Sequence, residues 1–160
     1  MKTSRYILTI VFTIIAGVST INAQSKQEKK EAIEKAIIEK VTSGKYKIEV
    51  STAYPRRGKV VNLSSSYSLE IRNDSVISHL PYYGRAYSIP YGGGNGLIFK
   101  APIDEYKMET NKKGAMKVNL IARSPEDRFK YTLTIYPNGS ASIDVNMQNR
   151  ESINFLGEVE

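Results

Sequence analysis

The sequence contains no cysteine, no tryptophan and only one histidine, His79. Without cysteine the chain has neither a disulfide nor a lipid-modified cysteine, although exported proteins often use both. Zinc and calcium sites need clustered cysteine, histidine or carboxylate ligands, and no such spacing occurs here. We therefore expect a fold held together by packing alone, with no cofactor and no bound metal.

The sequence also lacks a concentrated run of basic residues, although its formal net charge is +7. Domains that bind nucleic acid usually carry their lysines and arginines in one patch or stripe. Here these residues are spread along the chain, as is common in soluble proteins. We therefore expect no nucleic-acid partner.

Residues 1–23 have the layout of a secretory signal peptide. Lys2 and Arg5 make a basic start, residues 7–18 are almost wholly apolar, and Ala23 is a small residue before a cleavage point. The alternative is a membrane anchor, because a spanning helix needs ~20 mainly apolar residues. The polar last third of the segment favours cleavage. We expect a periplasmic or secreted protein that is not a lipoprotein and has no membrane span after processing.

Residues 25–43 predict an amphipathic helix. Ser25 and Glu28 have the spacing of a capping box, and Gly44 is a suitable stop. Three apolar residues recur every four positions and form a narrow stripe: Ile33, Ile37 and Val41. We expect this stripe to pack on a sheet. Contact with a membrane surface is the alternative, which the near balance of acidic and basic residues disfavours.

After Gly44 the apolar period changes from four to two, which is typical of strands with one buried face. Apolar residues alternate with polar ones in segments that begin at Tyr46, Tyr67, Val76, Met116, Phe129, Ala141 and Ile153. Short turns, of which Pro137-Asn138-Gly139 has the strongest signal, join neighbouring segments as hairpins. The sequence thus predicts a single mainly β (α+β) domain over residues 24–160. In it, one N-terminal helix packs on a curved antiparallel sheet or open barrel of about seven or eight strands.

The stretch HLPYYGRAYSIPYGGGNG, residues 79–96, is the strongest candidate for a site. Tyrosine rings suit sugars or peptides, and an arginine can clamp a carboxylate or a phosphate. The candidate ligand-binding residues are Tyr82, Tyr83, Arg85, Tyr87 and Tyr91. The alternative is a structural corner with a kink at Gly84 and a flexible glycine loop after it. If the strand continues through Tyr82 and Tyr83, one of them is in the core and the other is exposed.

Catalytic patterns are weak in this sequence. No nucleophile motif accompanies His79, which we interpret as a histidine on the wet face of a strand. Asp104, Glu105 and Glu109 offer carboxylates, but nothing fixes the separation that glycoside hydrolysis needs. The serine run 64–66 lacks a nucleophile-elbow context, and glycines 92–94 lack the Lys-Ser/Thr of a phosphate loop. We therefore expect no catalytic residues.

Several segments together resemble one known family. They are YPRRG (54–58), NDSVISHLPYYGRAY (73–87), GLIFKAP (96–102), YTLTIYPNGSASIDV (131–145) and NRESINFLG (149–157). In these segments the chain is similar to a family of small exported proteins of gut-type Gram-negative bacteria, known as domain of unknown function 4251. The resemblance spans residues 25–160. It implies export but supplies no activity, substrate or catalytic set.

Three classes of function stay open. The leading expectation is a non-enzymatic envelope or secreted β domain that binds a ligand or a protein, with an envelope glycan or protein as partner. The second is a purely structural assembly protein of the periplasm, and the third is a cell-wall-directed hydrolase. Exposed tyrosines that line one surface favour the first class, whereas His79 beside a carboxylate in a pocket would favour the third.

We predict that the mature protein begins at or near Gln24 and is soluble without detergent, because the basic, apolar and small-residue order of residues 1–23 directs cleavage. N-terminal sequencing of protein recovered from the envelope fraction checks this. An intact Met1 on membrane-embedded protein would show instead that the segment is an anchor.

Overall fold

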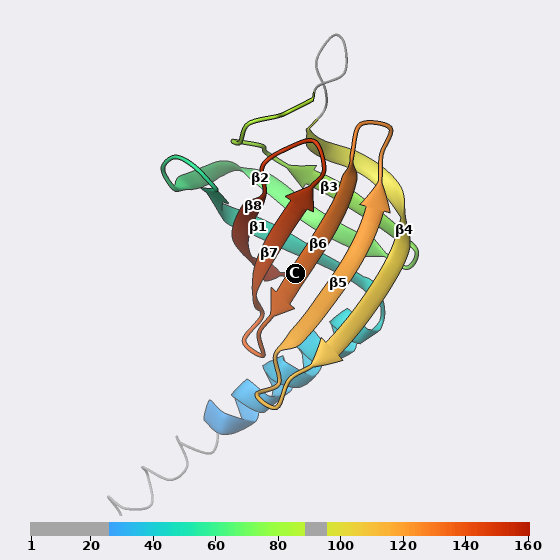
Figure 1. Ribbon diagram of the computed structural model, residues 1–160. Coiled ribbons are helices and arrows are strands. Elements are labelled where there is room, and N and C mark those ends of the chain that lie inside the picture. The colour runs from blue at the N-terminus through green and yellow to red at the C-terminus, as the bar shows by residue number, and fades with distance from the viewer. Residues whose placement is uncertain (1–25, 89–95) are drawn as a thin grey trace, which may run out of the picture.

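The computed structural model describes residues 26–88 and 96–160, which form one helix and eight strands (Figure 1). The helix covers residues 26–42, inside the predicted range. The strands are β1 (Lys45–Pro55), β2 (Val61–Arg72), β3 (Ser75–Leu80), β4 (Leu97–Thr110), β5 (Met116–Arg123), β6 (Arg128–Ile135), β7 (Ser140–Met147) and β8 (Ile153–Val159).

The strands form a closed antiparallel barrel. Each strand pairs with the next one along the chain, and β8 pairs with β1 to complete the circle. The prediction of an N-terminal helix on about seven or eight antiparallel strands is confirmed. The predicted sheet is a closed barrel rather than an open one, because β1 lies between β2 and β8.

Side chains fill the inside of the barrel. Alternate residues of the strands point inward, except in residues 104–110 of β4, which are all exposed, and the period of two in the sequence becomes one continuous core. Strand β6 illustrates this, since Phe129, Tyr131, Leu133 and Ile135 are all fully buried. The buried Tyr131 hydroxyl donates to Ser78 Oγ at 3.2 Å, and that hydroxyl donates to the Leu97 carbonyl at 2.6 Å. The polar groups at the centre of the barrel are therefore paired.

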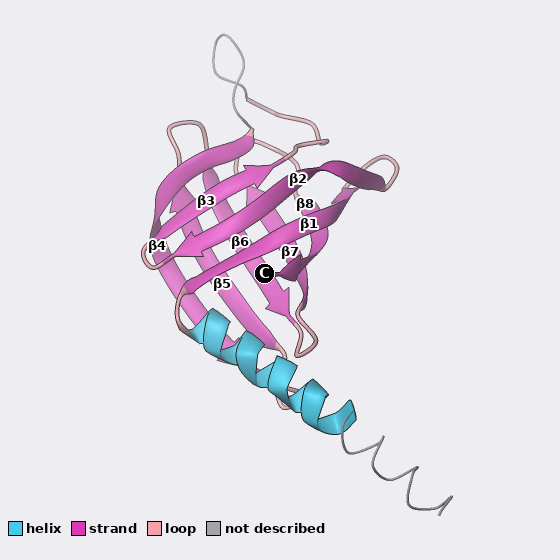
Figure 2. Cartoon of the chain, turned by 180° about the vertical axis from the view of Figure 1, so that it is seen from behind, coloured by secondary structure: helices cyan, strands magenta, loops and turns pink. Residues whose placement is uncertain are grey.

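The helix covers one end of the barrel (Figure 2). Ile37 and Val41 are buried there and belong to the same core as the strands. Ile37 reaches the β6–β7 turn, where a Cβ on Gly139 would lie 3.4 Å from its Cδ1 atom. The helix ends beside Gly44, whose N–H donates to the Val41 carbonyl at 3.1 Å.

The expectation that Ile33 also packs on the barrel was wrong, because its side chain is 43% exposed. The N-terminal part of the helix extends past the strands in both views (Figures 1 and 2), so the stripe continues where no strand remains to cover it. The predicted cap Ser25 lies outside the described residues, as does the segment 1–23. Within residues 26–88 and 96–160, no helix has the length and apolar character that crossing a membrane requires.

The two isoleucines provide a matched test of helix docking. Ile37→Ala removes a side chain that is only 8% exposed, and should lower the free energy of unfolding by about 2–4 kcal/mol. Ile33→Ala removes the same atoms from an exposed position, and should change it by less than about 0.5 kcal/mol. Urea unfolding of both variants measures the difference. Equal midpoints would show that the helix does not pack on the barrel through Ile37.

Candidate functional site

Three segments far apart in the sequence meet at the barrel end that lies away from the helix. They are the loop after β1, residues 81–88 after β3, and residues 148–152 between β7 and β8. Pairing of β1 with β8 places Pro55 opposite Ile153, which brings the first segment to the third. An isolated bridge between Ala86 and Arg150 brings the second segment to the third. We call this region the corner.

Glu151 joins the three segments of the corner. This residue is only 4% exposed, and its backbone N–H donates to the Arg85 carbonyl at 2.9 Å. Its own carbonyl accepts from the Tyr82 hydroxyl at 3.0 Å. Its carboxylate accepts from the Arg85 N–H at 3.4 Å and lies 3.5 Å from Nε of Arg57. One buried acidic residue thus holds both irregular segments in place.

Tyr82 forms the buried side of the corner. Its ring packs against the barrel core, and its hydroxyl also donates to the Arg85 carbonyl at 2.8 Å. Partial burial, with a further contribution from the Glu151 charge, raises the pKa of Tyr82 to about 12. A Cβ at position 84 would collide with the Tyr82 hydroxyl and lie 2.6 Å from its Cζ atom. The chain bends at Gly84 as predicted, and the Tyr82 ring folds back over this glycine.

The other side of the corner is an exposed surface that we call the rim: Tyr83, Arg85 and Tyr87. Tyr83 is 42% exposed and Tyr87 is 67% exposed. Tyr82 is partly buried against the core and Tyr83 is exposed, but the strand whose continuation was to separate them ends at Leu80. The Tyr87 N–H donates to the Asn149 carbonyl at 2.7 Å, so the backbone of the rim is anchored. Tyr91 and residues 92–95, which belong to the predicted site and loop, lie outside the described residues.

Buried polar residues behind the rim fix residues 148–151. The Asp127 carboxylate accepts from the backbone N–H groups of Gln148 and Asn149 at 3.0 and 3.2 Å. The buried Arg150 guanidinium contacts Glu126 at 2.9 Å and donates to the Gly96 carbonyl at 3.3 Å. Sequence reasoning missed Asp127, Arg150 and Glu151. The sequence feature that could have indicated them is the pair of adjacent charged residues, Arg150 and Glu151, just before the apolar strand that begins at Ile153.

The catalytic candidates of the sequence do not come together. The exposed His79 ring packs on Tyr67, with 5.4 Å between ring centroids. Asp104 pairs with Arg123 at 3.1 Å, while Glu105 and Glu109 are exposed on β4. Over the described ranges, His79 has no hydrogen bond or ion pair to a carboxylate, and no three His, Asp or Glu residues lie close enough to hold a metal ion.

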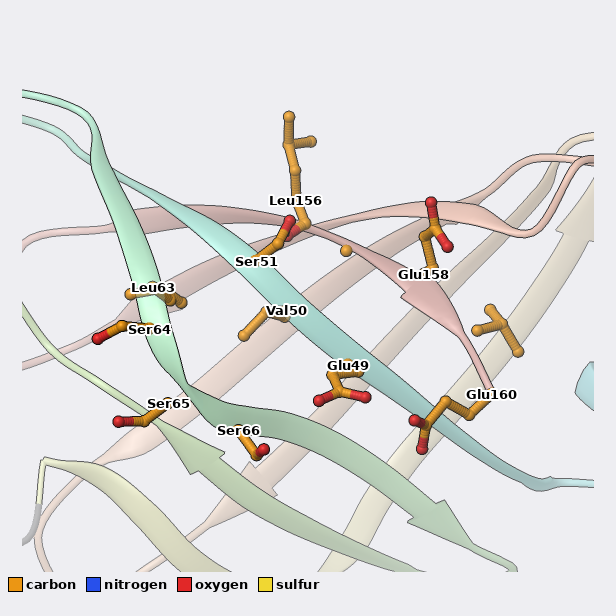
Figure 3. A pocket seen from close by; sticks show the side chains of 12 residues that line it. Glu49, Val50, Ser51, Leu63, Ser64, Ser65, Ser66, Leu156, Glu158 and Glu160 are labelled. Carbon is orange, nitrogen blue, oxygen red and sulfur yellow. The ribbon is translucent and has the colours of Figure 1, made fainter.

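A second feature is a groove of about 660 Å³ on the outside of the barrel (Figure 3). Strands β1, β2 and β8 line it with serines, two exposed or half-exposed leucines and three carboxylates: Ser51, Ser64, Ser65, Ser66, Leu63, Leu156, Glu49, Glu158 and Glu160. Figure 3 shows the Glu49 and Glu160 carboxylates side by side. A hydrogen bond that Glu49 donates to Glu160 raises the pKa of Glu49, whereas a hydrogen bond from the Lys47 ammonium lowers the pKa of Glu160. The groove is therefore acidic, although the chain as a whole is basic.

Comparisons with known proteins agree with the resemblance noted in the sequence. The family model described as "Domain of unknown function (DUF4251)" matches residues 27–159. A crystal structure of a DUF4251 family protein from Bacteroides eggerthii DSM 20697 is similar, with a TM-score of 0.60 and 14% sequence identity. The match covers 80% of this chain and 87% of that one, and shows a shared fold. No curated protein matches the sequence.

Proposed function

Since the chain belongs to the DUF4251 family, whose description names no activity, we propose a function from the geometry of the corner. The protein is an exported, non-enzymatic domain that binds an envelope glycan or protein through its rim. Residues 1–23, with their basic start and apolar stretch, support export to the periplasm or the cell exterior.

The observation that carries this proposal is an exposed Tyr-Arg-Tyr set on an anchored backbone. Tyr83, Arg85 and Tyr87 are exposed, yet the chain beneath them is tied to residues 149–151 by hydrogen bonds. A backbone that is already fixed loses little conformational entropy when a ligand binds. Tyrosine adds a large apolar face and a hydroxyl with few rotatable bonds. These properties are those of a binding surface.

The charge around the rim favours an anionic ligand. Arg85 is exposed, and the Arg57 side chain, 69% exposed, reaches the corner from the loop after β1. The acidic residue between them, Glu151, is buried and already hydrogen-bonded. Guanidinium groups bind carboxylates and phosphates in a bidentate manner, and tyrosine faces accept sugar rings or peptide planes. A glycan or peptide that carries carboxylates fits this chemistry.

The structural class of function accounts for the other half of the corner. Tyr82 and Glu151 connect the segment after β3 to the start of β8, and they would be needed even without a ligand. The same stretch is thus a structural support on its buried side and a binding surface on its exposed side. Tests of the binding role must therefore leave Tyr82 and Glu151 unchanged.

We expect the variant Tyr83→Ala/Arg85→Ala/Tyr87→Ala to bind its ligand at least about ten-fold more weakly than the wild type, because aromatic and arginine anchors carry most of the energy of an interface. Each change is at an exposed position, so the free energy of unfolding should fall by no more than about 1.5 kcal/mol in total. Calorimetry with soluble peptidoglycan fragments, acidic oligosaccharides and purified envelope proteins measures the affinity.

Tyr136→Ala is the matched control, because Tyr136 is exposed at the other end of β6, away from the corner. This control should retain full affinity for any probe that binds the wild type. A triple variant that binds all probes as tightly as the wild type would refute a binding role for the rim.

A further inference from the structure

The ladder between β1 and β2 opens at one point. Val50 pairs with Tyr67, but Thr52 pairs with Asn62, so β2 has extra residues where β1 has only Ser51. On the other side, the pairing of β2 with β3 begins only at Ser68. Among the described residues, positions 63–66 of β2 therefore have an extended conformation but no strand partner in either ladder.

This unpaired segment lies at a register shift of the β1–β2 ladder and carries no lysine, proline or charged residue. Proteins protect free edges with lysine, proline or inward-pointing charge, because an unpaired strand is a template for another one. Residues 64–66 are three exposed serines, and Leu63 beside them is half-buried. Their small, uncharged side chains leave the backbone N–H and C=O groups accessible to a partner strand.

The groove beside residues 63–66 is lined by carboxylates and therefore favours a positively charged ligand. Glu49 of β1 and Glu158 and Glu160 at the end of β8 line it, and no basic residue does (Figure 3). Lys47 does not line the groove but forms an ion pair with Glu160. Among the described residues, Glu49 and Glu158 form no ion pair. The pKa of Glu49 is raised first by its hydrogen bond with Glu160 and then by the charge of that carboxylate, so the two carboxylates lie close together.

From these observations we propose that residues 63–66 bind an extended segment of a partner protein by adding it as a strand, with a lysine or arginine of that segment in the carboxylate groove. Main-chain hydrogen bonds supply affinity in this mode of recognition, and alternate side chains of the peptide supply specificity. The volume of about 660 Å³ lies in the range of ~300–1,000 Å³ that ligand sites occupy. The exposed Leu156 provides an apolar contact beside the charged one.

This surface is separate from the rim. The rim is basic and aromatic and recognises an anionic ligand, whereas the groove is acidic and recognises a cationic strand. A failure of either proposal leaves the other intact, because no residue belongs to both surfaces.

Two synthetic eight-residue peptides test the proposal. One alternates lysine with valine and threonine, and the other has glutamate in place of each lysine. Fluorescence anisotropy with the purified protein should show saturable binding of the lysine peptide and at least about ten-fold weaker binding of the glutamate peptide. Equal affinity for the two peptides, or no binding of the lysine peptide at millimolar protein, would overturn the proposal.

Paired variants separate backbone pairing from charge. The N–H groups of adjacent strand residues point to opposite edges, so one of Ser64→Pro and Ser65→Pro removes a donor facing the groove and the other is its control. One of these variants should lose most of the affinity for the lysine peptide and the other should keep most of it. Equal affinity of both variants and the wild type would show that the backbone edge takes no part, which overturns strand addition.

The variant Glu49→Gln/Glu158→Gln should weaken binding of the lysine peptide about ten-fold, because two charge contacts are lost. Glu105→Gln/Glu109→Gln removes the same charge from exposed positions on β4 and should leave the affinity unchanged. Equal losses of affinity in both double variants would mean that net charge alone attracts the peptide, which overturns the proposed site.

Sedimentation equilibrium tests whether a second copy of the chain occupies the site instead. If the wild type forms dimers and Ser64→Pro or Ser65→Pro dissociates them, the occupant is a second copy, which overturns the assignment to a different protein.

Discussion

The close approach of β8 to β1 at Gly157 is the constraint on which the rest of the structure depends. A Cβ at this position would collide with the Glu49 carbonyl oxygen and would lie 2.8 Å from the Glu49 carbonyl carbon. The obstacle is backbone, which cannot move aside as a flexible side chain can. Only glycine therefore lets the last strand pair with the first and close the barrel at this register.

Both candidate surfaces follow from that closure. The pairing of β1 with β8 shifts by one residue at Ser51, and at the same residue β2 leaves the β1 ladder and opens the groove. Further along, the ladder brings the end of β1 to the start of β8, next to Glu151. That position lets Arg57 and residues 82–87 converge on one buried carboxylate. The filled interior leaves the outer surface and the barrel ends as the places where a ligand can bind.

Local patterns in the sequence predict the helix and the strands, but they do not predict that the strands close into a barrel. Alternation of apolar residues predicted the strands, because a strand exposes alternate side chains to the core, and the β6 residues 129–135 illustrate the rule. The pattern carries no information about which strand follows which around the barrel, so closure through Gly157 could not be read from it. For the helix, the sequence pattern predicted more burial than the structure has. Ile33 continues the apolar stripe of Ile37, but burial depends on where the barrel ends.

The residues of the site also differ in how far the sequence could indicate them. Strand alternation predicted that one of Tyr82 and Tyr83 packs and the other is exposed, but β3 ends at Leu80. The observed difference comes instead from the hydrogen bonds that hold the Tyr82 hydroxyl to the Arg85 and Glu151 carbonyls. Asp127 and Glu151 were missed because each acts through backbone groups that are distant in sequence or on another segment. A buried carboxylate that organises a loop has no spacing motif, since its partners are N–H groups that every residue carries.

Unfolding of Gly157→Ala in urea, compared with Leu156→Ala, tests most directly whether this close approach determines the barrel. Leu156 is exposed beside Gly157, so its truncation should change the free energy of unfolding by less than about 0.5 kcal/mol. The extra methyl group at position 157 should lower it by about 1–3 kcal/mol or more, because backbone must move to admit it. A Gly157→Ala midpoint equal to that of the wild type would contradict the claim that barrel closure depends on glycine at this position.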